Sequence, residues 1–402
     1  MISASSRDFV PGTPLRHFFE WNERRLWRHR RYWFLRQPQR LPRNVRLPFV
    51  AAVGSPDIAL HAAVFAALEE LESEQPPEPE RQRILVIRLS AFGDFIQALG
   101  PFAAIRRRHA GDRVTLLTTQ AFAGFAAELG CFDEVLVDER PGPLAIAAWL
   151  ALRRRLRQAR FHRVYDLQTS QRSAFYAWLM RPRLPRWSGT VWGCSHPHAN
   201  RGRDRQHTLD KQAEQLLMAG IYPTLLPSLP RFDRRLPEEL QSENFALLVP
   251  GSSPQHAAKR WPAGRFGLIA RALDRVGLRP VVVGTAPEAP LAAAIVAACP
   301  RALDLVGQTD LGLLAVLAQR AALTIGNDTG VCHLAAAAGG PVLVLFSRAS
   351  DPARHAPRGE FVRVLVEPDL AALPAERVIG EALALLEEWQ AALTAAIAGA
   401  AT

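Results

Sequence analysis

Two arrays of short apolar runs follow one another along the chain. From about residue 83, runs rich in β-branched residues alternate with helix-length stretches of Ala, Leu and Arg, and the pattern restarts after a Pro-rich break near 223–235. Continuous apolar runs of this length are typical of strands buried on both faces of a parallel sheet. The expected strands are ILVIRL (84–89), RVTLLTT (113–119), EVLV (134–137), RVYDL (163–167), FALLVPG (245–251), RPVVVG (279–284), LTIGND (323–328) and PVLVLFS (341–347). The pattern predicts an α/β protein with two Rossmann-like, doubly wound parallel-sheet domains.

The same pattern divides the chain into four parts. Residues 1–80 are irregular, rich in Arg and interrupted by Pro, and they form a basic, aromatic-rich extension and linker. Residues 81–235 and 236–365 carry the two strand arrays, and 366–402 contain a helix over about 376–396. In such folds ligands bind outside the carboxyl ends of the strands, here in a cleft that both domains are expected to face. The loops that directly follow strands are therefore where chemistry is expected.

Charge and cysteine content narrow the class of protein. The 402 residues include 49 Lys and Arg against 38 Asp and Glu, which gives +11 and favours phosphates, acidic lipids or nucleic acid as partners. The four cysteines form no CxxC pair, so neither a disulfide framework nor a zinc site is expected. No apolar run approaches the ~20 residues that span a bilayer, and the start MISASSRDFV is not typical of a secretory signal. We expect a cytoplasmic protein.

The loop after the first predicted strand carries a candidate base. It contains Arg88, Ser90, Gly93 and Asp94, and a helix is expected from about Phe95. One interpretation makes Asp94 a helix N-cap, a role worth ~1 kcal/mol. The other places its carboxylate at the mouth of the cleft as a general base. The loop lacks G-x-G-x-x-G, which disfavours a nicotinamide enzyme.

Polar residues also follow the first two strands of the second array. Ser252 and Ser253 end the first of these strands, and Lys259 stands just before a helix. Hydroxyls, a lysine and a helix N-terminus together form a plausible diphosphate cradle. Lys259 is one of only two lysines in the chain, although an exposed surface lysine is the alternative. Glu288 is expected either to accept hydrogen bonds from a ribose or to stand as a carboxylate at a helix start.

The segment GNDTGVCHL (326–334) is the strongest phosphate-binding pattern in the chain. A strand leads into a polar, glycine-containing turn and then into an alanine-rich helix. Asp328 would repel a phosphate, so we expect it to order the turn by capping the helix or holding Thr329. Gly330 permits close approach of a ligand, and His333 either reaches that ligand or is a buried, hydrogen-bonded histidine.

Four segments in this order resemble glycosyltransferase family 9, the ADP-heptose:lipopolysaccharide heptosyltransferases. The resemblance covers roughly residues 83–360. Its segments are ILVIRLSAFGD at the first strand, YDLQTSQRS (165–173) with WSG (187–189), PGSSPQHAAKRWP (250–262) and LVGQTDLGLLAVLAQRAALTIGNDTGVCHLAAAAGGPVLVLF (305–346).

The resemblance implies a GT-B fold and single-displacement, inverting transfer of a heptose from ADP-heptose to a lipopolysaccharide core, with no metal or cofactor. The acceptor would be held mainly by the first domain and the donor by the second. The resemblance makes Asp94 the catalytic base and Lys259 the group that neutralises the leaving diphosphate. Donor contacts fall on Ser252, Ser253, Glu288, Asp328, Thr329, Gly330 and His333. Residues expected on the acceptor side are Arg88, Ser90, Gln168 and Arg172.

Two departures from the family pattern leave the sugar and the acceptor open. Arg88 stands where family members commonly carry lysine, and Ser347 and Arg348 follow LVLF where the family often continues Gly-Pro-Thr. One alternative is a transferase of the same fold that uses another nucleotide sugar and another glycan. A more distant alternative is an inactive, transferase-like protein that binds nucleic acid, although no recognised reader motif is present.

The basic extension lies outside the resemblance. Residues 15–46 hold ten arginines, two acids and several aromatic residues. Such a segment is able to lie in the headgroup layer of an anionic membrane, and we expect it to contact the cytoplasmic face of the inner membrane. The alternative is that it packs on the protein or stays mobile.

Overall fold

A computed structural model of the chain describes residues 81–142, 144–200, 202–252 and 258–400. The basic extension therefore lies outside the described residues. The described chain divides into two compact units. Unit 1 contains the residues up to Ser90 together with Gly100–Leu225, and unit 2 contains Ala91–Leu99 and the residues from Leu226 onward.

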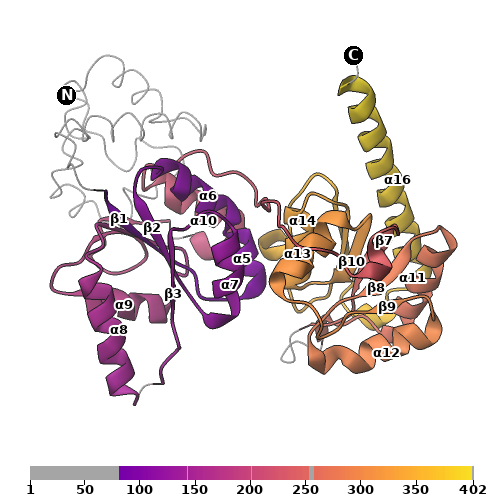
Figure 1. Ribbon diagram of the computed structural model, residues 1–402, viewed down its shortest axis with the longest axis horizontal. Coiled ribbons are helices and arrows are strands. Elements are labelled where there is room, and N and C mark those ends of the chain that lie inside the picture. The colour runs from indigo at the N-terminus through magenta and orange to yellow at the C-terminus, as the bar shows by residue number, and fades with distance from the viewer. Residues whose placement is uncertain (1–80, 143, 201, 253–257, 401–402) are drawn as a thin grey trace. The chain divides into compact units, whose positions relative to one another are not determined.

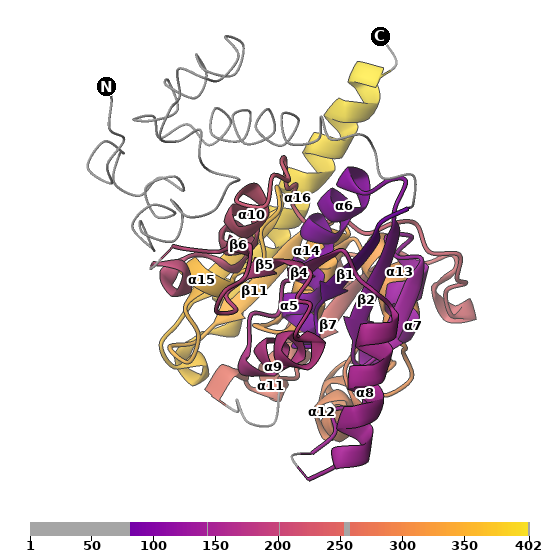
Figure 2. The ribbon, with the colours of Figure 1, turned by 90° about the vertical axis from the view of Figure 1, so that its left-hand side faces the viewer.

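Unit 1 is built on a six-stranded parallel sheet of order β3-β2-β1-β4-β5-β6 (Figures 1 and 2). Its strands are β1 (Arg83–Ile87), β2 (Arg113–Thr118), β3 (Glu134–Val137), β4 (Arg163–Asp166), β5 (Arg186–Gly189) and β6 (His196–Pro197). Its helices are α6 (Leu99–Arg108), α7 (Gln120–Glu128), α8 (Ile146–Gln158), α9 (Gln171–Met180) and α10 (Thr208–Leu217). β1 is buried from Ile84 to Ile87, as expected of a central strand covered on both faces.

Unit 2 repeats this plan with a six-stranded parallel sheet of order β12-β11-β10-β7-β8-β9. Its strands are β7 (Phe245–Val249), β8 (Arg279–Val282), β9 (Leu303–Asp304), β10 (Leu323–Asn327), β11 (Val342–Phe346) and β12 (Val362–Val366). Its helices are α5 (Phe92–Gln97), α11 (Ala263–Arg275), α12 (Ala289–Ala298), α13 (Leu311–Arg320), α14 (Gly330–Ala337), α15 (Pro352–His355) and α16 (Ala375–Ala400).

The two sheets have the same connectivity. In each, the first three strands run outward to one edge and the next three run to the other, so the direction of winding changes between the first and fourth strands. These switch points are β1/β4 in unit 1 and β7/β10 in unit 2. The prediction of two doubly wound parallel sheets is confirmed. Ligands of such sheets bind outside the carboxyl ends of the strands at the switch point.

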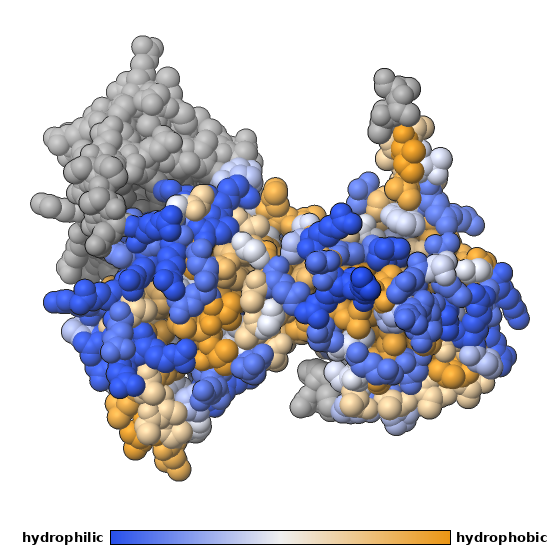
Figure 3. Space-filling model, viewed as in Figure 1, coloured by the Kyte–Doolittle hydropathy of each residue, from blue (hydrophilic) through white to orange (hydrophobic). Residues whose placement is uncertain are grey.

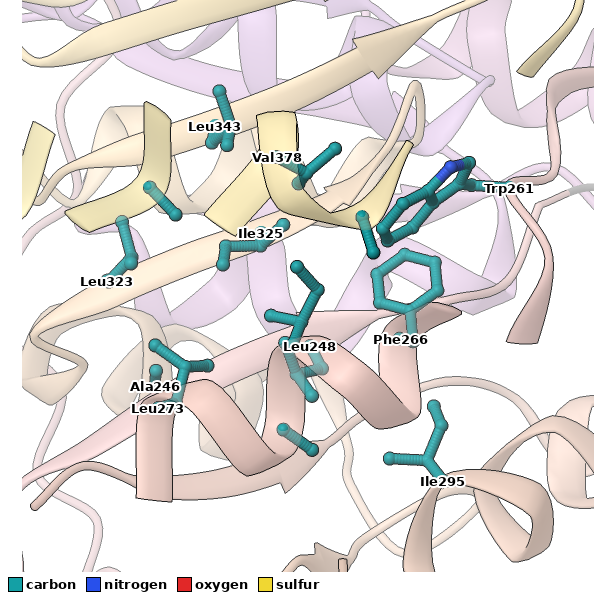
Figure 4. Packing of buried hydrophobic residues seen from close by; sticks show 14 of the residues in the cluster. Ala246, Leu248, Trp261, Phe266, Leu273, Ile295, Leu323, Ile325, Leu343 and Val378 are labelled. Carbon is teal, nitrogen blue, oxygen red and sulfur yellow. The ribbon is translucent and has the colours of Figure 1, made fainter. Parts of the chain in front are cut away.

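The core of unit 2 extends to the C-terminal helix. Figure 4 shows Leu248 and Ile325 of the sheet packed with Phe266 of α11 and Val378 of α16. A fully buried side chain of this kind contributes about 1.5–3 kcal/mol relative to an exposed one. The indole nitrogen of Trp261 also donates to the carbonyl of Leu373 at 3.0 Å. The sequence pattern set residues 366–402 apart, but in the structure they belong to unit 2 and contribute to its core.

Unit 2 also differs in two other places from the second domain expected from the sequence, which began at residue 236. Residues from Leu226 onward already belong to unit 2, because Leu229 N–H donates to Ala337 O at 3.0 Å and Pro230 O accepts from Gln319. Helix α5, which follows β1, also joins unit 2, because it packs on α14. Sequence patterns along one strand array do not report such contacts with the other.

No helix in the described ranges is long and apolar enough to cross a membrane.

Candidate active site

A buried asparagine joins the two loops at the switch point of unit 2. Asn327 ends β10 and is fully buried. Its Oδ1 accepts from the backbone N–H of Trp261 at 3.1 Å, and its Nδ2 donates to Pro250 O at 2.8 Å. One side chain thereby holds the segment after β7 and the start of α11 against the end of β10. Asn327 was not among the predicted site residues, although a polar residue ending a buried strand was a signal for it.

Lys259 and Asp328 form an ion pair next to the hydrogen bonds of Asn327. Lys259 Nζ lies 2.6 Å from Asp328 Oδ2, and the two side chains are only 18% and 7% exposed. Lys259 is therefore not an exposed surface lysine. Asp328 was expected to cap α14 or to hold Thr329, and this expectation is wrong. The N-cap of α14 is Thr329, without a side-chain capping bond, and the carboxylate of Asp328 is directed to the lysine instead.

The turn into α14 is tightly packed and leaves one hydroxyl without a partner. A Cβ added at Gly326 would lie 2.6 Å from Val249 Cβ and 2.9 Å from Cys332 Sγ, so this position accepts only glycine without a shift of its neighbours. Cys332 Sγ donates to Asn327 O at 3.2 Å. Thr329 Oγ1 is buried and makes no hydrogen bond to any described residue. A buried hydroxyl left unpaired costs free energy, so a bound ligand that pairs with it gains affinity.

An arginine that the sequence interpretation left out holds the loop after β7. Arg260 Nε donates to Ser252 Oγ at 3.1 Å, and its Nη2 donates to Ser252 O at 3.0 Å. Ser252 is buried at this position. The signal for Arg260 was its place beside Lys259 in a loop already assigned to phosphate. Ser253 lies outside the described residues.

Glu288 has two roles at the carboxyl end of β8. Its Oε2 accepts from Thr285 N–H at 2.7 Å and from Thr285 Oγ1 at 3.0 Å, which is the predicted helix-start alternative. The carboxylate also lies over two glycines. A Cβ at Gly251 would fall 1.6 Å from Glu288 Oε1, and one at Gly284 would fall 2.6 Å from Oε2. The structure therefore brings Glu288 to the loop after β7.

Asp94 lies in the first turn of α5. The helix begins at Phe92 rather than near Phe95, because Ala91 is extended and Phe95 N–H donates to Ala91 O at 2.9 Å. Asp94 is thus the third residue of the helix and not its N-cap. Its Oδ2 accepts from Ala91 N–H at 3.4 Å, and the side chain is half-buried. A carboxylate in this position is stabilised by the helix dipole.

Paired glycines bring α5 against the start of α14. A Cβ added at Gly93 would lie 2.8 Å from His333 Cδ2, and one at Gly330 would lie 2.4 Å from Phe92 Cδ1 and 2.8 Å from Gly93 N. Gly330 was expected to admit a ligand, but its missing side chain also admits α5. His333 is 7% exposed and packs at this contact. The candidate base and the candidate donor turn are therefore carried by one unit.

The switch point of unit 1 is closed by its own side chains. Gln168 Oε1 accepts from the backbone N–H groups of Leu89 at 2.8 Å and Ser90 at 3.2 Å. Arg88 is 5% exposed, and its Nη1 donates to Leu167 O at 2.5 Å. Three residues expected on the acceptor side, Arg88, Ser90 and Gln168, thus meet at β1/β4. Arg88 and Gln168 tie the two loops together.

Asp166 is a buried carboxyl that the sequence interpretation did not single out. It ends β4, and its Oδ1 accepts from Gln168 N–H at 3.1 Å and Thr169 N–H at 2.8 Å. Its Oδ2 is buried and makes no hydrogen bond to a described residue. Burial raises the pKa of Asp166 to about 6, against the opposing effect of these N–H groups and of Arg88. Its signal was an acidic residue at the end of a buried strand.

A model of glycosyltransferase family 9 (heptosyltransferase) matches residues 149–377. This chain belongs to glycosyltransferase family 9. Lipooligosaccharide heptosyltransferase 2 of Haemophilus influenzae is 31% identical over 98 residues, which are 23% of this chain and 28% of that relative. The matched part thus spans less than a third of the curated relative.

Solved structures show the same fold over most of the chain. The ADP-heptose lipopolysaccharide heptosyltransferase II of E. coli is 22% identical with a TM-score of 0.64, and the match covers 77% of this chain and 100% of that one. The family 9 glycosyltransferase of Veillonella parvula is 21% identical with a TM-score of 0.67, covering 77% and 99% of the two chains. The resemblance seen in the sequence is thereby confirmed at the level of family and fold.

Arg172, the fourth acceptor-side candidate of this family 9 chain, is held by an internal ion pair. Its Nε donates to Asp138 Oδ2 at 2.8 Å and its Nη2 to Asp138 Oδ1 at 3.0 Å, while its guanidinium lies 5.0 Å from the ring centre of Trp149. Burial opposes ionisation of Asp138, but hydrogen bonds from Arg172 and Tyr176 hold the pKa of this carboxyl below its usual value. Arg172 therefore fastens the start of α9 to the residue that follows β3.

Among the residues that the structure describes, no three His, Cys, Asp or Glu side chains gather in a group able to hold a metal ion.

Proposed function

We propose that this family 9 chain transfers a heptose, or a related sugar, from an ADP-sugar to a lipopolysaccharide core acceptor. The transfer would invert the anomeric centre in one displacement and would need no metal or cofactor. The observation that carries the proposal is the packing of α5 on α14. It places Asp94 in the same unit as the Lys259–Asp328 pair and the start of α14.

The donor side must stabilise the negative charge that develops on the departing ADP. The ammonium of Lys259 has three N–H donors, and Asp328 occupies one of them. The N–H groups at the start of α14 and the unpaired hydroxyl of Thr329 add further donors beside it. Removal of one such donor in other enzymes costs about 2.7–4 kcal/mol of transition-state stabilisation. Asp328 is given the role of positioning the lysine.

The acceptor side must remove a proton from the attacking hydroxyl. In the proposed reaction the acceptor oxygen bonds to the anomeric carbon while the bond from that carbon to the diphosphate breaks. The carboxylate of Asp94 takes the hydroxyl proton as attack proceeds. A positioned base of this kind contributes typically 10²–10⁴-fold. Asp94 is half-buried in the first turn of a helix whose place is fixed by two glycines.

The remaining candidates are assigned by their contacts. Ser252 and, outside the described residues, Ser253 belong to the diphosphate loop, and Glu288 Oε1, which lies over Gly251, is proposed to accept from the ribose. Gly330 and His333 form the contact with α5. On the acceptor side we propose Ser90 as a contact residue. Arg88, Gln168 and Arg172 would act by positioning the loops after β1, β3 and β4.

The decisive experiment is product analysis by mass spectrometry. The purified full chain is incubated with a truncated lipopolysaccharide acceptor and, in parallel, with ADP-heptose, an ADP-hexose, a GDP-sugar or a UDP-sugar. A mass increase of one heptose with ADP-heptose alone is expected. Transfer only from a GDP- or UDP-sugar would replace this proposal with the alternative of another donor. Absence of any transfer, together with salt-dependent binding of nucleic acid, would favour the inactive alternative.

A peripheral position on the cytoplasmic face of the inner membrane is part of the same proposal. It rests on the composition of residues 15–46, which lie outside the described residues. Deletion of residues 1–46 is expected to weaken binding to anionic vesicles, and unchanged binding would contradict it.

A further inference from the structure

Helices α8 and α9 of unit 1 expose a cluster of large apolar side chains. On and just before α8, Leu144 is 92% exposed, Ile146 68% and Leu150 57%, and on α9 Trp178 is 60% exposed beside the exposed Phe175. Figure 3 shows orange surface at the end of unit 1 where Figure 1 places α8. We call these five residues the α8–α9 patch. Contiguous exposed apolar surface on a soluble protein generally marks an interaction site.

The patch is hollowed into a groove rather than formed by scattered residues. The groove has a volume of about 570 Å³ and lies between the two helices. Its lining is mainly apolar and aromatic, and it includes Ile146, Trp149, Leu150, Phe175 and Trp178.

Aromatic contacts fix the shape of the groove. The ring of Phe175 packs edge-on against Trp149 at 4.9 Å between ring centres and stacks on Trp178 at 5.3 Å. The indole nitrogen of Trp149 donates to Gly142 O at 2.9 Å, and the guanidinium of Arg172 covers its ring. The exposed rings therefore stand on a supported platform instead of on loose side chains. An ordered apolar surface of this kind is prepared to bind before any partner arrives.

The charge around the patch is positive. Along α8, Ile146, Leu150, Arg153 and Arg157 follow one another at intervals of four, three and four residues, so they form one stripe that is apolar at its start and basic at its end. Arg154 is exposed next to this stripe. Neither α8 nor α9 contains an Asp or Glu.

We propose that the α8–α9 patch docks on an anionic lipid bilayer. Trp178, Phe175 and the aliphatic residues of the patch would enter the boundary between headgroups and acyl chains, where aromatic rings concentrate in membrane proteins. The arginines at the end of α8 would bind lipid phosphates, because their long side chains extend from apolar surface to charged headgroups. The stripe of arginines without acids favours this occupant over a protein surface of mixed charge. Docking by the α8–α9 patch is independent of the transferase reaction and adds a second surface to the membrane contact proposed for residues 15–46. Its use in presenting a lipid-linked acceptor rests on the proposed function.

The test is flotation of the full chain with lipid vesicles in the absence of any nucleotide sugar. The patch variant carries Ile146→Ser, Leu150→Ser and Trp178→Ser. Its matched control carries Ile397→Ser, Leu393→Ser and Trp192→Ser, which change the same residue types at exposures of 65%, 46% and 68%. Because all six side chains are exposed, neither variant empties the core. Calorimetric titration with ADP and thermal melting confirm that each variant is folded.

The patch variant is expected to lose roughly tenfold or more of its partition onto vesicles containing phosphatidylglycerol, and the control little. A second variant, Arg154→Gln with Arg157→Gln, is expected to lose roughly tenfold on these vesicles at low salt and little on pure phosphatidylcholine. Equal binding of patch variant and control would overturn the proposal. The proposal would also be overturned if the wild type were a dimer and the patch variant a monomer, because a second copy of the chain would then cover the patch.

Discussion

The two switch points have the same strand order, but the side chains around them form different hydrogen bonds. At β1/β4 of unit 1, the side chains of Gln168 and Arg88 bond to backbone groups and close the loops on themselves. At β7/β10 of unit 2, the side chain of Asn327 joins the loops and Lys259 pairs with Asp328, which leaves the other N–H groups of Lys259 and the hydroxyl of Thr329 as donors. The difference teaches that the doubly wound sheet provides the place for a site, and that the internal hydrogen bonds decide which groups remain for a ligand.

The two switch points also treat their carboxylates differently. Asp166 in unit 1 accepts from the backbone N–H groups of Gln168 and Thr169, and burial raises its pKa despite the charge of Arg88. Asp328 in unit 2 is paired with Lys259 at 2.6 Å. A carboxyl whose burial outweighs its hydrogen bonds resists ionisation, whereas one in an ion pair holds a cation in place. Four substitutions test the candidate site of unit 2 and the buried carboxyl of unit 1.

The largest effect is expected from Asp94→Asn. The amide keeps the size of the carboxylate and is able to accept from Ala91 N–H, but it cannot take a proton from the acceptor. Turnover is expected to fall by about 10²–10⁴-fold, while the affinity for ADP stays within a factor of about two. Steady-state kinetics and calorimetric titration measure the two quantities. A variant with normal turnover would remove Asp94 from its role as base.

The next largest effect is expected from Lys259→Met, which keeps the length of the side chain and removes its charge. The diphosphate loses a charged donor, and the carboxylate of Asp328 loses its partner. A lost hydrogen bond to a charged group costs about 1.5–3 kcal/mol, so ADP affinity should fall roughly 10–150-fold, with slower transfer. Asp328→Asn is the comparison, since it keeps the ammonium. Equal losses in the two variants would show that the intact ion pair, rather than the charge of Lys259, is what ADP needs.

A smaller effect is expected from Gly330→Ala. The new methyl group would lie 2.4 Å from the ring of Phe92 and 2.8 Å from Gly93 N, so α5 must move away from α14. Misplacement of Asp94 by a fraction of an ångström should lower kcat roughly tenfold, since a shift near 1 Å is able to cost 10²-fold.

Gly264→Ala is the control for this variant. It lies in α11 with nothing within 4 Å of the added Cβ, and alanine favours a helix. Full activity in Gly330→Ala would show that the contact between α5 and α14 does not set the position of the base.

The apolar pattern was sufficient for much of the fold. Eight strands were located from continuous apolar runs, and seven of them are largely buried, because strands inside a parallel sheet are covered on both faces. The eighth, β3, lies at a sheet edge and is half-buried. The short strands β5, β6 and β9 were missed, since two to four residues of mixed polarity give no period. β12 (Val362–Val366) lies at a sheet edge and alternates Arg363 with apolar residues, so it did not match a buried run.

The site was predictable as a set of loops but not as a set of contacts. Placing Lys259 and Asp328 after parallel strands followed from the fold, but their ion pair joins residues 69 positions apart. The bonds of Asn327 to Trp261 and Pro250 span 66 and 77 positions. Such partners depend on strand order and register, which local patterns do not specify. For the same reason, nothing near Asp94 in the sequence indicated that α5 would join unit 2.

An effect on stability is expected from Asp166→Asn. The folded-state pKa of about 6 lies above the ordinary value of 3.8, so the native state binds the proton more tightly than the unfolded chain. The contribution of this group to stability is therefore highest below about pH 4, falls as the pH rises through about 6, and stays low above that. Asparagine cannot ionise, and its Oδ1 still accepts from Gln168 and Thr169.

The stability of the variant relative to the wild type should therefore increase as the pH rises. The difference in unfolding free energy, variant minus wild type, is expected to increase by about 3 kcal/mol between about pH 4 and pH 8, from a shift of roughly two pKa units at 1.36 kcal/mol each. Urea unfolding at a series of pH values measures it. A difference that stays constant with pH would mean that Asp166 ionises as readily in the fold as in the unfolded chain. The contrast between the buried carboxyl of Asp166 and the ion-paired carboxylate of Asp328 would then have no energetic basis.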